Sequence, residues 1–157
     1  HLVLSSLHTN DAPATISRLI EIGAEPYLIG ATLLGVMAQR LIRMLCPHCK
    51  ETGEIDAKAW KTLVSPAKIK LPVNTYRAVG CDEWRQTGYL GRIGIYEALL
   101  IDTEIRTLIN NTRDLAEYHR AAQKQGMRSL RISGAQKIAE GVTTMEEIYS
   151  VIPPDDN

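Results

Sequence analysis

Three cysteines are the residues of this 157-residue sequence whose spacing points most directly to chemistry. Cys46 and Cys49 form a C-x-x-C pair, a spacing with which two thiolates bind one metal ion. Cys81 lies about where a second such pair would begin, and four thiolates would make a closed structural zinc site. An odd number of cysteines with one close pair is typical of a reduced protein with a metal site or its remains, and not of a secreted disulfide framework.

The cysteines leave other interpretations open. Three thiols without metal are also acceptable in a protein interior, because cysteine packs as a small apolar residue. A catalytic cysteine is disfavoured, since His48 stands beside the pair only as part of the C-x-x-C spacing and no third orienting group is evident.

A second polar cluster, His8, Thr9 and Asn10, follows an apolar run over residues 2–7. A run of this length favours a buried strand, and ligands of open α/β sheets bind at the carboxyl ends of the strands. His8 could donate to a phosphate oxygen, while Thr9 and Asn10 could hold a water or a metal-bound phosphate. The same residues also suit a helix cap with a surface histidine, and the spacing alone does not choose between the two.

The elements that must position these residues follow from apolar periodicity and capping residues. The pattern predicts a strand over 2–7, then a helix capped by Asn10 or Asp11, and a second helix from Pro26 to about Leu45, apolar almost all round in its first half. An irregular insertion over 46–89 includes a helical stretch, and a strand then precedes four helices. The expected ranges are 57–64 for the helical stretch, 92–101 for the strand, and 102–110, 114–125, 129–140 and 143–151 for the helices, with a capping box from Thr143 to Glu146 and a disordered tail over 153–157.

Composition narrows the function classes. The formal net charge is zero, so nothing resembles the strongly basic domain of a typical nucleic-acid binder. The longest apolar stretch, residues 26–38, is too short to cross a bilayer, so we expect a soluble protein that reaches a membrane only through a partner. A single strand cannot satisfy its own backbone groups, so the partners of residues 2–7 are expected upstream, and the chain is expected to be a fragment.

Three sequence blocks resemble a known family. Residues 1–11 resemble the histidine box of the type II/IV secretion ATPase superfamily. The blocks 35–49 (GVMAQRLIRMLCPHC) and 81–97 (CDEWRQTGYLGRIGIYE) then follow in the order seen in type II secretion and type IV pilus-assembly ATPases. The resemblance covers the chain nearly end to end, and its motifs are long and specific.

The resemblance implies an α/β fold, namely the C-terminal portion of a RecA-like P-loop ATPase domain. It divides the chain into the end of the ATPase core (1–45), a cysteine-bearing insertion (46–89), a C-terminal strand and helical bundle (90–152) and the tail. It implies a homohexameric motor at the cytoplasmic face of the bacterial inner membrane. ATP and Mg²⁺ would drive it to assemble a pilus or pseudopilus through an inner-membrane platform protein. His8, Thr9 and Asn10 would then be catalytic. The insertion favours an assembly or secretion motor over a retraction motor.

Two departures limit what the resemblance implies. The sequence contains no G-x-x-x-x-G-K-[ST] phosphate loop, so the full-length parent should be an ATPase and this chain alone should not. The family's second cysteine pair is also C-x-x-C, whereas this sequence has Trp84 at the fourth position, which makes zinc doubtful. Three thiolates with His48, Asp82, a water or a neighbouring molecule could still bind zinc, more weakly.

Arginines provide the last candidate ligands. Arg92, between Gly91 and Ile93, is a candidate for the adenine side of a nucleotide, since a guanidinium can stack on a base or pair with phosphate. Arg40 is the other candidate, although Arg40 and Arg43 also suit a structural role, such as neutralising Glu97 or a helix end. On the expected helix, positions 40 and 43 would share a face.

Two other classes of protein compete with the motor. A zinc-ribbon-like module that binds nucleic acid would need a complete metal site and a basic face with aromatic residues, and here only 5% of residues are aromatic. A helical interaction module would account for residues 102–151 alone. The motor interpretation predicts no nucleic-acid partner.

The missing phosphate loop generates a first prediction. The 157-residue chain by itself should bind Mg²⁺–ATP weakly or not at all and release no phosphate, because the backbone cradle and lysine that hold the phosphates are absent. Titration calorimetry and a phosphate-release assay, with an intact P-loop ATPase as positive control, would measure both. Turnover at a rate typical of motors would show that the chain contains a complete site.

Overall fold

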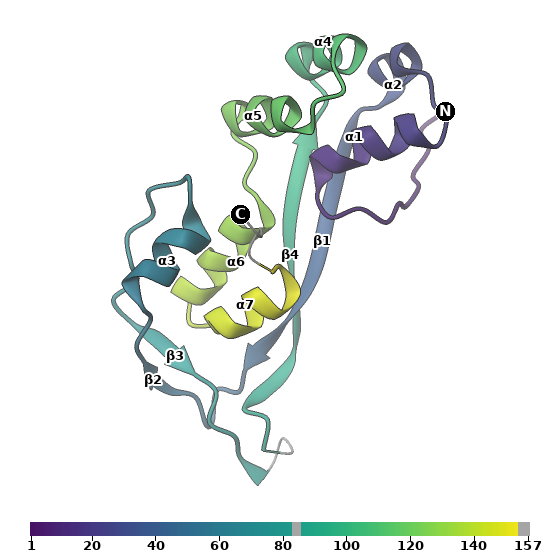
Figure 1. Cartoon of the computed structure of the whole chain (residues 1–157). Helices are drawn as coiled ribbons and strands as arrows, with labels where there is room; N and C mark the ends of the chain where they lie inside the picture. Colours follow the sequence, from purple (N-terminus) through teal and green to yellow (C-terminus); the bar gives the residue numbers. More distant parts are fainter. Residues whose placement is uncertain (83–85, 154–157) are drawn as a thin grey trace. The chain divides into compact units, whose positions relative to one another are not determined.

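The computed structural model describes residues 1–82 and 86–153 as a mixed α/β structure (Figure 1). Its residues divide into two compact units, and two of the three boundaries between them fall inside strands. Unit 1 comprises His1–Ala38 and Tyr96–Ser129, and unit 2 comprises Gln39–Ile95 and Leu130–Asn157. No helix among the described residues is both long enough and apolar enough to span a bilayer.

Unit 1 contains four helices, α1 (Ala12–Glu21), α2 (Pro26–Thr32), α4 (Thr103–Asn111) and α5 (Leu115–Gln125), and all but α2 have a side-chain cap at the N-terminus. The Asp11 carboxylate accepts from the Ala14 N–H at 2.8 Å and caps α1, so Asp11 is the cap of the two residues, Asn10 and Asp11, that the sequence offered. Asp102 and Asp114 cap α4 and α5 in the same way, and Gly126 ends α5 in the left-handed conformation that glycine tolerates. Helix α2 packs on α4 and α1 on α5, which buries a shared core of Ala12, Ile16, Ile29, Ile105, Ile109 and Tyr118.

Unit 2 packs three helices beside a small sheet: α3 (Ala57–Val64), α6 (Leu130–Ala139), α7 (Met145–Val151), β2 (Glu51–Gly53) and β3 (Thr75–Arg77). Strands β2 and β3 are antiparallel, with Thr52 opposite Tyr76. Helices α6 and α7 approach closely, since a Cβ at Gly134 would lie 2.7 Å from the Ile148 Cδ1 atom. The four helices expected together after residue 102 therefore divide between the units, with α4 and α5 in unit 1 and α6 and α7 in unit 2.

The predicted helix from Pro26 to Leu45 is wrong beyond residue 32. Helix α2 ends at Thr32, and residues 35–45 form strand β1 (Gly35–Leu45), which pairs with β4 (Tyr89–Leu100). Along β1 the buried positions include Ala38 and Ile42, while Met37 and Leu41, each one residue earlier, are exposed, as on a strand with one covered face. An apolar run of this length does not distinguish helix from strand, and the pairing with β4 decides the outcome.

The expected buried strand over residues 2–7 is also absent. These residues form no strand, and Leu2, Val3 and Leu4 are 76%, 77% and 89% exposed. A strand requires a partner for its backbone N–H and C=O groups, and no described strand pairs with this stretch. The tail expected to be disordered lies outside the described residues from position 154 onward.

The last helix is capped one residue later than the sequence pattern predicts. Thr144, not Thr143, caps α7, and its hydroxyl accepts from the Glu147 N–H at 3.2 Å. The Thr143 hydroxyl instead donates to the Arg43 carbonyl on β1 at 2.8 Å. The two adjacent threonines each satisfy the capping-box spacing, so only the contact with β1 selects the register.

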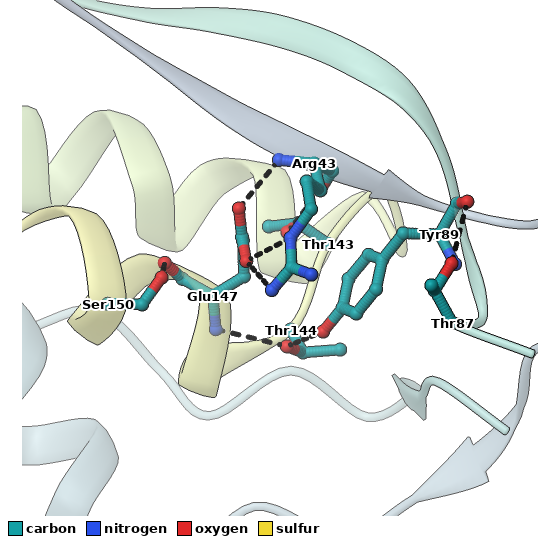
Figure 2. A network of polar contacts seen from close by, with 7 residues as sticks. All are labelled: Arg43, Thr87, Tyr89, Thr143, Thr144, Glu147 and Ser150. Carbon is teal, nitrogen blue, oxygen red and sulfur yellow. Dashed lines mark hydrogen bonds and ion pairs between the residues drawn. The ribbon is translucent and has the colours of Figure 1, made fainter.

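A buried carboxylate joins α7 to β1 and β4 within unit 2 (Figure 2). Glu147 is 4% exposed and accepts from the backbone N–H and the Nε of Arg43, both at 2.8 Å, and from Nη2 as well. The Arg43 guanidinium lies 4.3 Å from the centre of the Tyr89 ring, and the Tyr89 hydroxyl contacts the Thr144 hydroxyl at 2.8 Å. The hydrogen bonds with Glu147 raise the pKa of Arg43, so the guanidinium stays charged at all ordinary pH values.

This network generates a second prediction. Glu147→Ala should lower the free energy of unfolding by about 2–3 kcal/mol, because it leaves the Arg43 N–H and guanidinium without their acceptor. Urea unfolding followed by circular dichroism would measure the loss. The matched control is Glu146→Ala, which removes an exposed carboxylate from the same helix turn and should cost less than about 1 kcal/mol. Equal losses in the two variants would contradict a special role for the buried pair.

Candidate functional site

The three thiols gather at one place in unit 2. The Sγ atoms of Cys46, Cys49 and Cys81 all lie within 4.8 Å of one another. Cys46 is fully buried, whereas Cys49 and Cys81 are partly exposed, and none of the three forms a disulfide. Residues that are far apart in the sequence thus supply a compact set of sulfur ligands.

Backbone geometry fixes the positions of these thiols. Cys46 follows β1 directly, and its N–H donates to the Gly88 carbonyl at 2.9 Å. The Lys50 N–H donates back to the Cys46 carbonyl at 3.0 Å and closes the turn that carries Cys49. Beside Cys81, Gly80 has φ +105° and its Cβ position lies 2.5 Å from the Gln86 carbonyl oxygen, so only glycine fits there.

Backbone N–H groups donate hydrogen bonds to the sulfur atoms of Cys46 and Cys49. Burial alone would raise the pKa of Cys46, but the N–H groups of His48 and Cys49 and the neighbouring thiols hold this pKa below its usual value. Burial and the neighbouring thiols of Cys81 and Cys46 raise the pKa of Cys49 to about 11, although a hydrogen bond from the N–H of Gly80 acts to lower this pKa. The cluster therefore favours the thiolate form more strongly at Cys46 than at Cys49 when no metal neutralises the charge.

This arrangement fits three of the four positions around a zinc ion. Tetrahedral zinc with Zn–S bonds of about 2.3 Å separates its sulfurs by about 3.8 Å, within the observed spacing. N–H groups that donate to ligating sulfur stabilise the thiolate form that a metal requires. Within residues 1–82 and 86–153, neither His48 nor Asp82 joins the cluster, and the Asp82 carboxylate accepts from the Gln86 amide instead. Trp84 lies outside the described residues.

His8, Thr9 and Asn10 precede α1 in unit 1. His8 and Asn10 are exposed, and the half-buried Thr9 hydroxyl lies 2.9 Å from the Thr15 hydroxyl. The following residues are anchored firmly, since the Ala12 N–H donates to the buried Glu97 carboxylate at 2.8 Å and Asp11 lies 3.4 Å from the His119 Nε2. The polar cluster thus leads directly into a fixed helix N-terminus.

The candidate arginines lie on β1 and β4, in the parts of these strands that belong to unit 2. Arg92 is exposed on β4, and Arg40 is half-buried on β1, where its Nη1 donates to the Gln39 carbonyl at 3.0 Å. Because β1 is a strand and not a helix, Arg40 and Arg43 lie three residues apart on opposite faces and do not share one. The structural role considered for Arg43 is observed, with Glu147 as its partner in place of Glu97.

The sequence analysis missed two tertiary contacts made by carboxylates. One is the ion pair of Glu147 with Arg43, and the other is the contact of Asp11 with His119. Glu147 could have been noticed as the second of two possible capping-box positions, but its partner Arg43 lies 104 residues away in the chain. The Asp11–His119 contact likewise joins α1 and α5, and no local spacing signals it.

Comparison with known proteins decides the family. The family model described as type II/IV secretion system protein matches residues 1–150. The chain belongs to this family. It is 52% identical over 153 residues to the type IV pilus assembly ATPase TfpB of Acinetobacter baylyi, covering 98% of this chain and 26% of that protein.

Other relatives give the same assignment. The chain is 47% identical to type II secretion system protein E of Pseudomonas aeruginosa, over 96% of this chain and 30% of that protein. It is 45% identical to the type IV pilus assembly ATPase PilB of Myxococcus xanthus, over 99% of this chain and 28% of that protein. The chain thus spans between a quarter and a third of the length of these relatives and belongs to the type II secretion and type IV pilus-assembly ATPase family.

The thiol cluster generates a third prediction. The purified chain should carry clearly less than one equivalent of zinc, and Trp84→Cys should raise both zinc occupancy and melting temperature, because it completes the second C-x-x-C pair. Trp84→Ser removes the same ring without adding a thiolate and should leave occupancy unchanged. Atomic absorption measures the metal. Stoichiometric zinc in the unsubstituted chain would show that another group supplies the fourth ligand.

Proposed function

We propose that this chain is part of a cytoplasmic motor ATPase that powers type II secretion or type IV pilus assembly. The observation that carries the proposal is the family match over residues 1–150, together with two relatives named as type IV pilus assembly ATPases and one named as a type II secretion system protein. Assembly of a homohexamer and contact with an inner-membrane platform protein are parts of the same proposal. We further propose that the motor extends pili or pseudopili and does not retract them.

The chemistry requires groups from outside the 157 residues. Because the sequence contains no G-x-x-x-x-G-K-[ST] loop, the phosphate cradle and the hydroxyl that binds Mg²⁺ must come from other residues of the working motor. This chain would supply His8 as a donor to the transferred phosphoryl group, with Thr9 and Asn10 orienting the attacking water. Arg92 and Arg40 would lie toward the adenine base.

Features of unit 1 support a catalytic role for His8. The side chain is exposed, so it is available to a nucleotide, and it stands four residues before the first residue of α1, whose first turn is held by Asp11 and Glu97. An anchored helix start gives the preceding residues a defined position, which phosphoryl transfer requires because it relies on positioning and on charge stabilisation.

The cysteine cluster is proposed to have a structural role. A zinc ion held by Cys46, Cys49 and Cys81 would cross-link the end of β1 to the segment that leads into β4. Such a metal contributes folding free energy and no step of ATP hydrolysis.

A fourth prediction tests the proposed function. In the motor protein that contains this chain, His8→Ala should lower kcat for ATP hydrolysis by about 100-fold or more, because a charge-stabilising donor to the phosphoryl group is lost. The melting temperature should stay the same, since His8 is exposed. His48→Ala, at another exposed histidine, is the matched control and should leave kcat unchanged. A normal kcat in His8→Ala would remove His8 from the mechanism, and absence of ATPase activity in the unsubstituted motor would overturn the proposed function.

A further inference from the structure

The three thiols of unit 2 are nucleophiles that the proposed motor chemistry does not use. All three are free, and their Sγ atoms lie within 4.8 Å of one another. Among the described residues they form a set of three, whereas a closed zinc site requires four ligands. An incomplete set holds a metal more weakly, so its thiolates are free for longer to react with other partners.

Two of the three thiols can be reached from solvent. Cys49 and Cys81 are partly exposed, whereas Cys46 is fully buried. Attack on an external disulfide requires a sulfur that the other molecule can approach, so Cys49 or Cys81 must react first. Cys46 would have to leave the packed core to join in, and this movement would open a cavity. The accessible pair is therefore Cys49 with Cys81.

The backbone holds Cys49 beside Cys81 without a bond between the two sulfurs. The N–H of Gly80, one residue before Cys81, donates a hydrogen bond to the Cys49 sulfur. Gly80 has φ +105°, and a Cβ there would lie 2.5 Å from the Gln86 carbonyl oxygen, so the turn accepts only glycine. Folding alone thus brings together two thiols that are far apart in the sequence, which favours a bond between them over reactions with separate molecules.

We propose that Cys49 and Cys81 form a thiol–disulfide exchange site, which small-molecule disulfides oxidise to an intramolecular disulfide. One thiolate attacks a sulfur of glutathione disulfide and expels a glutathione thiolate, which leaves a mixed disulfide on the protein. The second thiolate attacks the protein sulfur of this mixed disulfide and expels the other glutathione thiolate. Two electrons pass from the cysteines to the reagent, and the two protons end on the released glutathione thiols.

Oxidation and metal binding exclude each other at this site. A disulfide sulfur no longer provides a thiolate, so the oxidised cluster retains only the Cys46 thiol of its three ligands. The disulfide replaces the cross-link that a metal would make, because it also joins the turn after β1 to the segment that leads into β4. The inference goes beyond the proposed function and does not depend on ATP hydrolysis.

Equilibration of the whole 157-residue chain with glutathione and glutathione disulfide tests the proposal. After removal of metal by a chelator, acid quenching and alkylation in denaturant, a tryptic digest should contain peptide 44–50 linked to peptide 78–85. Mass-spectrometric fragmentation should place the alkylated thiol at Cys46. The equilibrium constant for disulfide formation should be about 100-fold higher in the folded chain than in about 8 M urea, because the fold keeps the sulfurs close.

Variants of the cluster separate its members. Cys81→Ala should remove the linked peptides and leave glutathione adducts as the main product. The matched control, Cys46→Ala, keeps a small apolar residue in the core and should change the equilibrium constant less than about threefold. Zinc added in excess should lower the disulfide fraction, and the oxidised chain should carry no zinc by atomic absorption. Circular dichroism checks that each variant remains folded.

Four results would overturn the proposal. The first is glutathione adducts without linked peptides in the unsubstituted chain, and the second is a disulfide within peptide 44–50, which would assign the reaction to Cys46 and Cys49. The third is an equal equilibrium constant in the folded and the unfolded chain. The fourth is zinc binding that oxidation leaves unchanged. Because no nucleotide is used, each of these results would leave the proposed ATPase function intact.

Discussion

A buried carboxylate needs partners that match its charge and hydrogen-bonding capacity, and in unit 2 Glu147 finds them in Arg43. This pair sets how α7 lies on β1, and the same strand continues for three residues into Cys46. The Leu45 N–H donates to the Val142 carbonyl at 2.7 Å, next to the threonines that contact Arg43 and Tyr89. The position of the first metal ligand therefore depends on a contact between β1 and the turn before α7.

At the start of α1 in unit 1, backbone N–H groups also need hydrogen-bond partners. The first N–H groups of a helix have no partners within the helix, and here Asp11 and the buried Glu97 provide them. One acceptor is local and the other comes from β4, so the cap fixes α1 both to its own preceding turn and to a distant strand. This arrangement gives Thr9, and the exposed His8 before it, a defined starting point for the role proposed in phosphoryl transfer.

The stretch from Cys46 to Tyr89 combines two features of different character. Its thiols gather in a compact cluster that suits a structural metal, while residues 57–73, between Cys49 and Cys81, present exposed lysine and aliphatic side chains. A metal cross-link at the base of such an insertion would limit its conformational freedom.

The sequence by itself determined the features that depend on neighbouring residues. Asp11, Asp102 and Asp114 cap the helices that follow them, Gly126 ends α5, and the three long motifs place the chain in its family. Only the tertiary structure decided which apolar runs become strands, because β1 forms by pairing with β4 across a long sequence separation and residues 2–7 have no partner among the described strands. The same limit applies to the sites. The cysteine spacing predicted that Cys46, Cys49 and Cys81 form one set, whereas the choice of Thr144 over Thr143 and the pairing of Arg43 with Glu147 required contacts that no local pattern encodes.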